Sequence, residues 1–291
     1  MQNNPPQRPD FRCLHRLRVR WAEVDMQKIV FNSHYLMYFD TAMADYWRAL
    51  AIPYEETMHQ LGGDLYVKKA SIEYFASARY DDTLDVGLKC VKLGNSSIIF
   101  HGGIFSGDKL LVTCELVYVH ADPATQTSRP VPQGLRDLFT AFEAGEPMTE
   151  LKIGDWQALG LDAGKLRRQV FVREQGVDET EEWDTADATA VHAVVYNRLG
   201  QPLATGRLLL TAPQVAKIGR MATHRVLRGS GLGRCVLDAL MQRAAERGDT
   251  QVRLQAQTSA CAFYAKAGFI ETGKPYTEVG IQHIDMVKKL A

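Results

Sequence analysis

The sequence predicts an α+β chain of two domains: an antiparallel sheet around one long helix, followed by a mixed α/β domain. Three observations lead to this expectation. The 291 residues exceed the usual size of one domain. Apolar residues recur every three or four positions over 35–50, ahead of several β-rich segments separated by turn residues. After residue 150, strand and helix patterns alternate. The 46% of hydrophobic residues is enough to build two cores.

The first domain is expected at 12–143, after a disordered, proline-rich tail at 1–11. A strand at 14–21 precedes the long apolar helix, which is too apolar for a surface helix. The β-rich segments that follow are separated by the turn signals DD (81–82), GN (94–95) and SGD (106–108). A helix at 134–143 ends the domain, and the strands are expected at 65–75, 84–93, 96–105 and 109–120.

The second domain is expected at 151–291, after a linker at 144–150. Its first helical stretch is predicted over 161–175. A hairpin at 190–196 and 202–210 leads into a strand at 215–223. The remaining pattern predicts a helix at 231–248 that ends at Gly248, a strand at 251–255 and a short helix within 259–269.

Composition argues against several classes of protein. The 34 basic and 34 acidic side chains give a net charge of zero, so we expect neither nucleic acid nor an anionic membrane as a partner. No apolar run reaches membrane-spanning length, and the polar N-terminus does not look like a signal peptide. Five scattered cysteines form no C-x-x-C, which predicts neither disulfides nor a metal site and fits the cytoplasm: 13, 90, 114, 235 and 261.

The stretch RGSGLGR, residues 228–234, lies where a strand gives way to a helix. The first N–H groups of a helix are unpaired and its dipole favours an anion. Glycines let a pyrophosphate approach the backbone closely, and Arg228 and Arg234 add positive charge. Taken alone, the stretch fits an ordinary glycine-rich turn equally well.

A second motif follows it, A-x-x-F-Y-x-K-x-G-F within 259–269. Together the two motifs resemble the acetyl-CoA-binding core of the GNAT N-acetyltransferases. The segments FVREQGV (171–177) and VGIQHIDMVKK (279–289) are most similar to the ElaA-like branch. The resemblance implies that the strand end at 221–223 contacts the thioester and pantetheine, that 228–234 holds the pyrophosphate, that Ser259 contacts CoA, and that Tyr264 protonates the departing thiolate. The implied acetyl-CoA-binding residues are Met221, Ala222, Thr223, Arg228, Gly229, Ser230, Gly231, Leu232, Gly233, Arg234 and Ser259.

The sequence does not identify the general base that would deprotonate an amine. His283 and Asp285 lie two residues apart, on one face of a predicted strand, and are the first pair to consider. Glu174 and His192 are further candidates. For each of them, a satisfied buried histidine or a surface carboxylate is the commoner explanation, and Tyr264 could be a packed aromatic beside CoA.

The N-terminal half carries its own motif, R-x-R-W-x-E-x-D-x-x-x-I-V-F-x-x-x-Y over 18–35. It resembles the hotdog-fold acyl-CoA thioesterases of the 4-hydroxybenzoyl-CoA thioesterase and YbgC type. The resemblance implies that Asp25 is the catalytic carboxylate and that the backbone N–H of Asn32 stabilises the thioester oxygen. It also implies a homodimer or homotetramer. The family usually has glycine at the position of Lys28. A lysine there could change the conformation of the turn or narrow the approach to its backbone.

The alternatives near Asp25 are structural. Asp25 could be a turn or capping aspartate, and Asn32, Ser33 and His34 could cap the helix. Glu23 is expected to be structural. Lys68, Lys69 and Arg79 could meet CoA phosphates, although exposed basic residues usually bind nothing specific.

The two resemblances together imply a bifunctional CoA-thioester enzyme. The N-terminal half would hydrolyse an acyl-CoA, and the C-terminal half would acetylate an unidentified amine from acetyl-CoA. No cofactor is expected to be tightly bound. In the alternative, only one half is catalytic and the other is an acyl-CoA sensor or an oligomerisation module.

Overall fold

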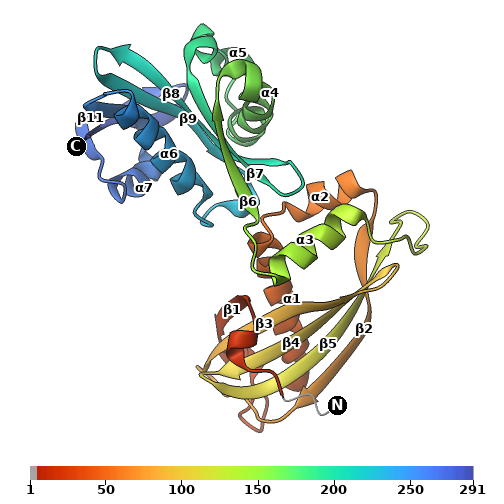
Figure 1. Cartoon of the computed structure of the whole chain (residues 1–291). Coiled ribbons are helices and arrows are strands. Elements are labelled where there is room, and N and C mark those ends of the chain that lie inside the picture. The colour runs from red at the N-terminus through yellow and green to blue at the C-terminus, as the bar shows by residue number, and fades with distance from the viewer. Residues whose placement is uncertain (1–4, 291) are drawn as a thin grey trace. The chain divides into compact units, whose positions relative to one another are not determined.

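The computed structural model describes residues 5–290 and divides into two compact units, one ending at Met148 and the next beginning at Thr149 (Figure 1). The division falls inside the predicted linker at 144–150. Among the described residues, no helix has the length and apolar character needed to cross a bilayer.

The first unit is an antiparallel sheet of five strands in the order β1-β3-β4-β5-β2, with a long helix, α1, against it (Figure 1). Two more helices complete it. The elements are β1 (Cys13–Arg18), α1 (Asn32–Ala49), α2 (Tyr54–Leu61), β2 (Asp64–Tyr74), β3 (Thr83–Leu93), β4 (Ser97–Ser106), β5 (Lys109–Ala121) and α3 (Gln133–Glu143). The sequence pattern missed α2, whose eight residues are too few to show a clear helical repeat.

The apolar stripe of α1 is buried, as its sequence predicted. Phe39 and Tyr46 are fully covered. A Cβ atom on Gly102 of β4 would come within 2.6 Å of the Phe39 ring, so this glycine is what allows the helix to lie close to the sheet. Tyr46 contacts the rings of Phe100 on β4 and Phe142 on α3, at centroid distances of 5.4 and 5.1 Å. Aromatic packing therefore joins helix, sheet and α3 into one core.

The prediction of a disordered tail at 1–11 is wrong for the part that the structure describes. Arg8–Asp10 forms a 3-10 turn, and the Arg8 guanidinium pairs with Asp85 at 2.7 Å. Phe11 is 6% exposed and packs edge-on against Phe105. One apolar anchor and one ion pair hold a segment whose proline content alone suggested disorder. Residues 1–4 lie outside the described part of the chain.

The second unit has a seven-stranded mixed sheet in the order β11-β12-β10-β9-β8-β7-β6, in which only β9 and β10 pair in parallel among the strands of the described chain. Its elements are β6 (Thr149–Gly154), α4 (Trp156–Arg167), a π-helical segment (Arg168–Glu174), α5 (Glu179–Glu182), β7 (Val191–Asn197), β8 (Pro202–Ala212), β9 (Val215–Thr223), α6 (Leu232–Glu246), β10 (Gln251–Gln257), α7 (Cys261–Ala265), β11 (Ile270–Glu278) and β12 (Ile281–Lys289).

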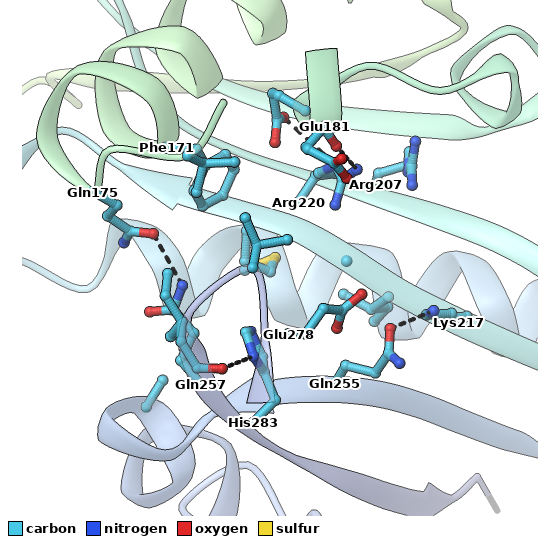
Figure 2. A pocket seen from close by; sticks show the side chains of 18 of the residues that line it. Phe171, Gln175, Glu181, Arg207, Lys217, Arg220, Gln255, Gln257, Glu278 and His283 are labelled. Atoms are coloured by element: carbon cyan, nitrogen blue, oxygen red, sulfur yellow. Dashed lines mark hydrogen bonds and ion pairs between the residues drawn. The ribbon is translucent and has the colours of Figure 1, made fainter. Parts of the chain in front are cut away.

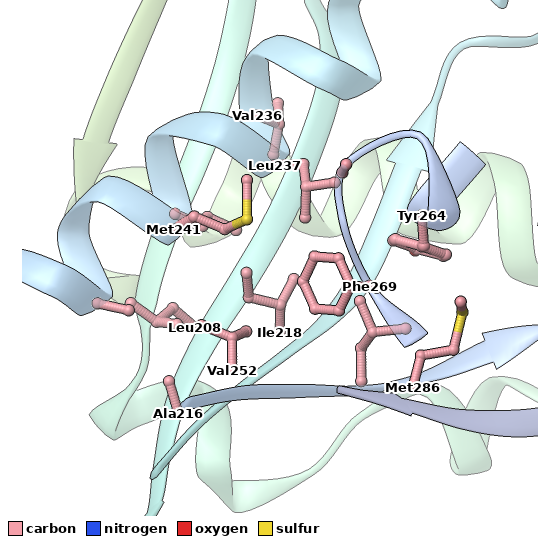
Figure 3. Packing of buried hydrophobic residues seen from close by; sticks show 14 of the residues in the cluster. Leu208, Ala216, Ile218, Val236, Leu237, Met241, Val252, Tyr264, Phe269 and Met286 are labelled. Carbon is pink, nitrogen blue, oxygen red and sulfur yellow. The ribbon is translucent and has the colours of Figure 1, made fainter. Parts of the chain in front are cut away.

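Helices cover both faces of this sheet. Along β7, Ala193 and Val195 belong to the core under α6, whereas Val194 and Tyr196 pack against α4. Alternate strand residues point to opposite faces, so α6 and α4 lie on opposite sides. Figure 3 shows the α6 side, where the helix packs over β8, β9 and β10. The helix predicted over 161–175 instead begins at Trp156, because Asp155 caps it by accepting a hydrogen bond from the Ala158 N–H.

Candidate functional site

The sheet of the second unit opens between its two parallel strands. β9 and β10 pair only from Val215 to Lys217 on β9 and from Gln251 to Arg253 on β10. Beyond these positions both strands continue without pairing to each other. A cavity of about 260 Å³ lies at this opening, lined in part by Lys217–Met221 of β9 and by Gln255 and Gln257 of β10. Residues of the predicted site gather around it.

The end of β9 offers free backbone groups to this opening. The N–H of His224 donates to the carbonyl of Leu203 at 2.8 Å, on the β8 side. Because consecutive strand residues direct their N–H and C=O groups to opposite sides, those of Met221 and Thr223 point away from β8. The Thr223 carbonyl accepts a hydrogen bond from Arg228 Nε at 3.2 Å on that side. The predicted thioester-binding residues therefore have donors facing the unpaired side.

The 228–234 stretch forms the entry to α6, as predicted. Gly229 and Gly231 have φ angles of +83° and +90°, a region that favours glycine. A Cβ added to either would meet no heavy atom within 4 Å, so backbone conformation and not crowding selects glycine there. Gly231 is the N-cap of a 15-residue helix without a side-chain cap. The open loop and the uncapped helix start suit an anion.

Arg228 is already paired. Its Nη1 and Nη2 atoms contact Glu174 at 2.6 and 2.7 Å, in a bidentate arrangement. The hydrogen bonds from Arg228 hold the pKa of Glu174 below its ordinary value. A carboxylate with a lowered pKa is a weak proton acceptor, which argues against Glu174 as the general base in this state. Arg234 bonds to Asp238 and to the Lys266 carbonyl, and Ser259 is exposed.

Tyr264 and His283 both line the cavity. Figure 2 shows His283 in its wall. Tyr264 is 8% exposed, and burial raises its pKa to about 12, so it stays a proton donor at neutral pH. His283 Nδ1 lies 2.9 Å from the Ile281 carbonyl, which can only accept. Nδ1 must therefore carry the hydrogen, leaving the Nε2 lone pair free to take a proton.

The other two candidates for the base lie elsewhere. Asp285 shares the face of His283 on β12, but it is exposed and accepts a hydrogen bond from the Tyr276 hydroxyl at 2.9 Å. His192 is 1% exposed, and burial lowers its pKa. Its Nε2 lies 3.0 Å from the Asp187 carbonyl, inside the fold. Of the four candidates, His283 alone combines a place in the cavity wall with a free acceptor nitrogen.

Asp25 of the first unit lies in a tight turn ahead of α1. Its Oδ1 accepts from the Gln27 N–H at 2.8 Å, and its carbonyl accepts from the Lys28 N–H at 2.9 Å. Lys28 has a φ angle of +61°. The turn thus keeps the left-handed conformation that suits a glycine, although a lysine occupies the position. Lys28 leaves the turn intact and adds strain to it.

The helix that follows the turn begins without a side-chain cap. Its N-cap is Phe31, so Asn32, Ser33 and His34 occupy the first three helical positions. The capping interpretation of these three residues is therefore wrong, because each lies inside the helix. The first N–H groups of α1, including that of Asn32, have no partner within the helix. Burial raises the pKa of Tyr35, one turn into the helix, and the Asp25 charge contributes to the rise, which places Asp25 near this helix start.

Apolar side chains surround this turn. Trp21, Met26 and Phe31 are 74%, 101% and 48% exposed, and Trp21 contacts the exposed ring of Tyr80. Glu23, in contrast, is buried and bonded to Arg20 and to the Tyr38 hydroxyl, as expected of a structural carboxylate.

Comparisons with known proteins agree with the division into two units. Residues 162–290 match the model of the acetyltransferase (GNAT) domain, and residues 19–139 match the model of the thioesterase-like superfamily. The uncharacterized protein YyaT of Bacillus subtilis is 35% identical over 133 residues, which is 45% of this chain and 88% of YyaT. The uncharacterized N-acetyltransferase YjcF of the same organism is 34% identical over 128 residues, 44% of this chain and 90% of YjcF.

The chain belongs to the GNAT acetyltransferases. A thioesterase-like domain is present in its N-terminal unit, at residues 19–139, so the protein as a whole is a two-domain protein related to CoA thioesters. Among solved structures, a thioesterase of Thermus thermophilus crystallised with coenzyme A and zinc is 24% identical, with a TM-score of 0.41 over 47% of this chain and 98% of its own. We refer below to the GNAT half and the thioesterase half.

The structure adds residues that the sequence did not single out. Arg220 and Glu278 line the GNAT cavity, together with Glu181 and Gln255. No motif marks them, because Arg220 lies at an irregularity of β9 and Glu278 is the last residue of β11. Within residues 5–290, no cluster of three or more His, Cys, Asp or Glu side chains is suited to a metal ion.

Proposed function

We propose that the GNAT half transfers the acetyl group of acetyl-CoA to an amine. The observation that carries this proposal is the cavity at the end of β9, where a free histidine nitrogen, a protonated tyrosine and unpaired strand N–H groups surround one space. These are the groups that acyl transfer needs: a base, an acid and donors for the developing oxyanion.

The transfer follows from these positions. The acceptor nitrogen gives its proton to His283 Nε2 and attacks the carbonyl carbon of the thioester, forming the C–N bond. Charge that develops on the carbonyl oxygen is stabilised by the N–H groups at the end of β9. The C–S bond then breaks, its electron pair stays on sulfur, and the Tyr264 hydroxyl protonates the thiolate. When the acceptor enters as an ammonium, the proton left in excess on the new amide nitrogen passes to the Tyr264 phenolate and restores its hydroxyl. The 228–234 loop holds the pyrophosphate. Arg228 leaves Glu174 and binds the pyrophosphate instead.

The test measures free thiol released from acetyl-CoA in the presence of a panel of amines. We expect amine-dependent release that falls by about 10²–10⁴-fold in His283→Gln, with the KM for acetyl-CoA unchanged. Release that does not depend on any amine, or that is the same in His283→Gln, would contradict the proposal.

We propose further that the thioesterase half hydrolyses an acyl-CoA, with Asp25 as nucleophile or as the base for water. The observation that favours this second activity is the Asp25–Lys28 turn, which keeps a glycine-type conformation next to the uncapped start of α1. Such a helix start supplies donors and a dipole for the thioester oxygen, and the exposed apolar residues nearby suit an acyl chain. A homodimer or homotetramer formed through this half stays a prediction.

Thiol release without added amine tests this activity. We expect hydrolysis of at least one acyl-CoA from a panel of short, long and aromatic chains, lost in Asp25→Asn. If the wild type hydrolyses none, the thioesterase half acts as an acyl-CoA-binding or assembly module instead.

A further inference from the structure

Arg220 has an unusual backbone position in the wall of the GNAT cavity. The pairing of β8 with β9 shifts between Thr205 and Arg207, where β9 contains one extra residue. Arg220 lies at this bulge with a φ angle of +51°. A left-handed conformation is strained for any residue with a Cβ atom. Bulges beside active sites commonly redirect a side chain, and a strained residue that persists points to a role.

The Arg220 guanidinium is held loosely, in contrast to its two neighbours. Arg167 and Arg207 bind the surrounding carboxylates at 2.5–2.8 Å in their ion pairs. Arg220 comes no closer than 3.4 Å to Asp184 and 3.5 Å to Glu182. Among the described residues, its Nη1 has no hydrogen-bond partner, and its Nε is buried without one. Most of the N–H donors of Arg220 therefore make no short hydrogen bond within the described protein.

This arginine faces the groups that the proposed transfer uses. Arg220 lines the same cavity as His283 and Tyr264, and Figure 2 shows it beside Glu181, across from His283 and Glu278. Glu278, the last residue of β11, is exposed and presents its carboxylate in the cavity wall. One wall therefore presents an under-used cation, and the other presents a carboxylate together with the candidate base.

We propose that the acetyl acceptor is an amino acid or a similar small aminocarboxylate, whose carboxylate binds Arg220 while its amine faces His283. This inference rests on the proposed acetyltransferase function. The planar fork of an arginine matches a carboxylate better than any other anionic partner except phosphate. A ligand carboxylate at ordinary hydrogen-bond distance is a closer partner than any that Arg220 has within the described protein. The ammonium group of the entering amino acid is attracted by Glu278 before His283 takes its proton.

The competing possibility is an acceptor with two positive charges. Glu181 and Glu278 both line the cavity, and a diamine could bridge them. It would leave Arg220 with only its loose partners and would bring two further positive charges into a cavity that Arg207, Lys217 and Arg220 already line. The strained backbone and the unused donors of Arg220 favour the aminocarboxylate, and the experiment separates the two.

The experiment compares amino acids with the amines obtained by removing their carboxyl group. The full-length protein is assayed with acetyl-CoA and leucine against isoamylamine, phenylalanine against phenethylamine, lysine against cadaverine, and arginine against agmatine. We expect kcat/KM for at least one amino acid to exceed that of its amine by about tenfold or more, as a charge-assisted hydrogen bond provides. Arg220→Met should abolish this preference through a higher KM for the amino acid, leaving the KM for acetyl-CoA unchanged, and Arg220→Lys should restore part of it.

Arg253→Met serves as the control, because Arg253 is an exposed arginine of β10 outside the cavity lining. It should leave the preference intact. Equal use of amino acids and their amines, an equal effect of Arg220→Met on both, or a preference for cadaverine and agmatine would each overturn the aminocarboxylate while leaving the acetyltransferase proposal in place. If no compound of either kind is acetylated, both proposals fail together.

Discussion

The two candidate sites share one backbone arrangement but build it from different residues. Each places a left-handed turn ahead of a helix that begins without a side-chain cap. In the GNAT half the turn residues are Gly229 and Gly231; in the thioesterase half the residue is Lys28. The surroundings differ as well, with exposed aromatic residues around Asp25 and a buried group of ion pairs behind the GNAT cavity.

The difference shows which property each site needs. A pyrophosphate must reach the backbone N–H groups, so a loop with several glycines is useful there. A carboxylate that acts on a thioester needs only a fixed turn, which a strained lysine can maintain. Acyl chains bind to apolar surfaces, whereas a small charged amine binds to charged groups. Substitutions in one half at a time should therefore have separate effects.

The largest effect is expected from breaking the ion pairs behind the GNAT cavity. Arg167 is 1% exposed and pairs with Glu182 and Asp187. In Arg167→Met the buried Glu182 keeps only the more distant Arg220, at 3.5 Å, and Asp187 keeps only Arg207. We expect the GNAT half to lose about 3–5 kcal/mol of stability. Hydrogen exchange followed by mass spectrometry should show faster exchange in peptides after residue 149 alone.

The neighbouring exposed arginine gives the matched control. Arg168 pairs with Glu179 at the surface, so Arg168→Met should change stability by at most about 1 kcal/mol. Equal effects of the two substitutions would mean that burial of the ion pairs does not matter.

Acid should weaken the same group of ion pairs. Burial alone would raise the pKa of Asp187, but hydrogen bonds from Arg167 and Arg207 outweigh it and lower the pKa. A lowered folded-state pKa contributes stability above the ordinary carboxyl value of about 3.9, and this contribution is lost as the pH falls through the folded value. The GNAT half should therefore lose stability below about pH 4. In Asp187→Asn, already less stable at pH 7, the loss measured by near-ultraviolet circular dichroism should be smaller; an unchanged acid transition would contradict this assignment.

The sequence predicted those features that depend on residues close together in the chain, and it missed those that depend on residues far apart. The long helix, most of the strands and the 228–234 loop depend on local patterns and were predicted close to their observed bounds, whereas β6 and β11 were not predicted. The Arg228–Glu174 ion pair joins residues 54 positions apart, and the position of Arg220 depends on a bulge between two strands. No local pattern reports such contacts. For the same reason the tail at 5–11 was mispredicted, since Phe11 is fixed by the distant Phe105.

The glycine loop provides the next test. Gly231→Ala forces a Cβ into a φ of +90° at the helix start, which should raise the KM for acetyl-CoA about tenfold. Gly200→Ala imposes a similar strain, at a φ of +73° in the β7–β8 turn, away from the cavity lining. It should leave the KM for acetyl-CoA unchanged. A similar rise in both variants would show that strain in the fold, and not binding at the loop, is the cause.

The smallest effect is expected from relieving the strain at Lys28. Lys28→Gly removes a left-handed cost of roughly 1–2 kcal/mol but adds about 0.4–1 kcal/mol of chain entropy to the unfolded state. The net result should be a stabilisation of about 0.5–1 kcal/mol, seen as slower exchange in peptides before residue 148. Lys109→Gly, at a position without a positive φ, should destabilise instead. If Lys28→Gly also destabilises, the lysine contributes a contact that outweighs the strain.

The central claim is that each half has its own thioester chemistry, and a crossed assay tests it most directly. Wild type, Asp25→Asn and Tyr264→Phe are each assayed for acyl-CoA hydrolysis without amine and for amine-dependent release from acetyl-CoA. We predict that Asp25→Asn loses only the hydrolysis and that Tyr264→Phe, in which the thiolate lacks its proton donor, is slowed only in the amine-dependent reaction. Loss of both activities in either variant would contradict two separate sites, and loss of neither would show that these residues are not the catalytic ones.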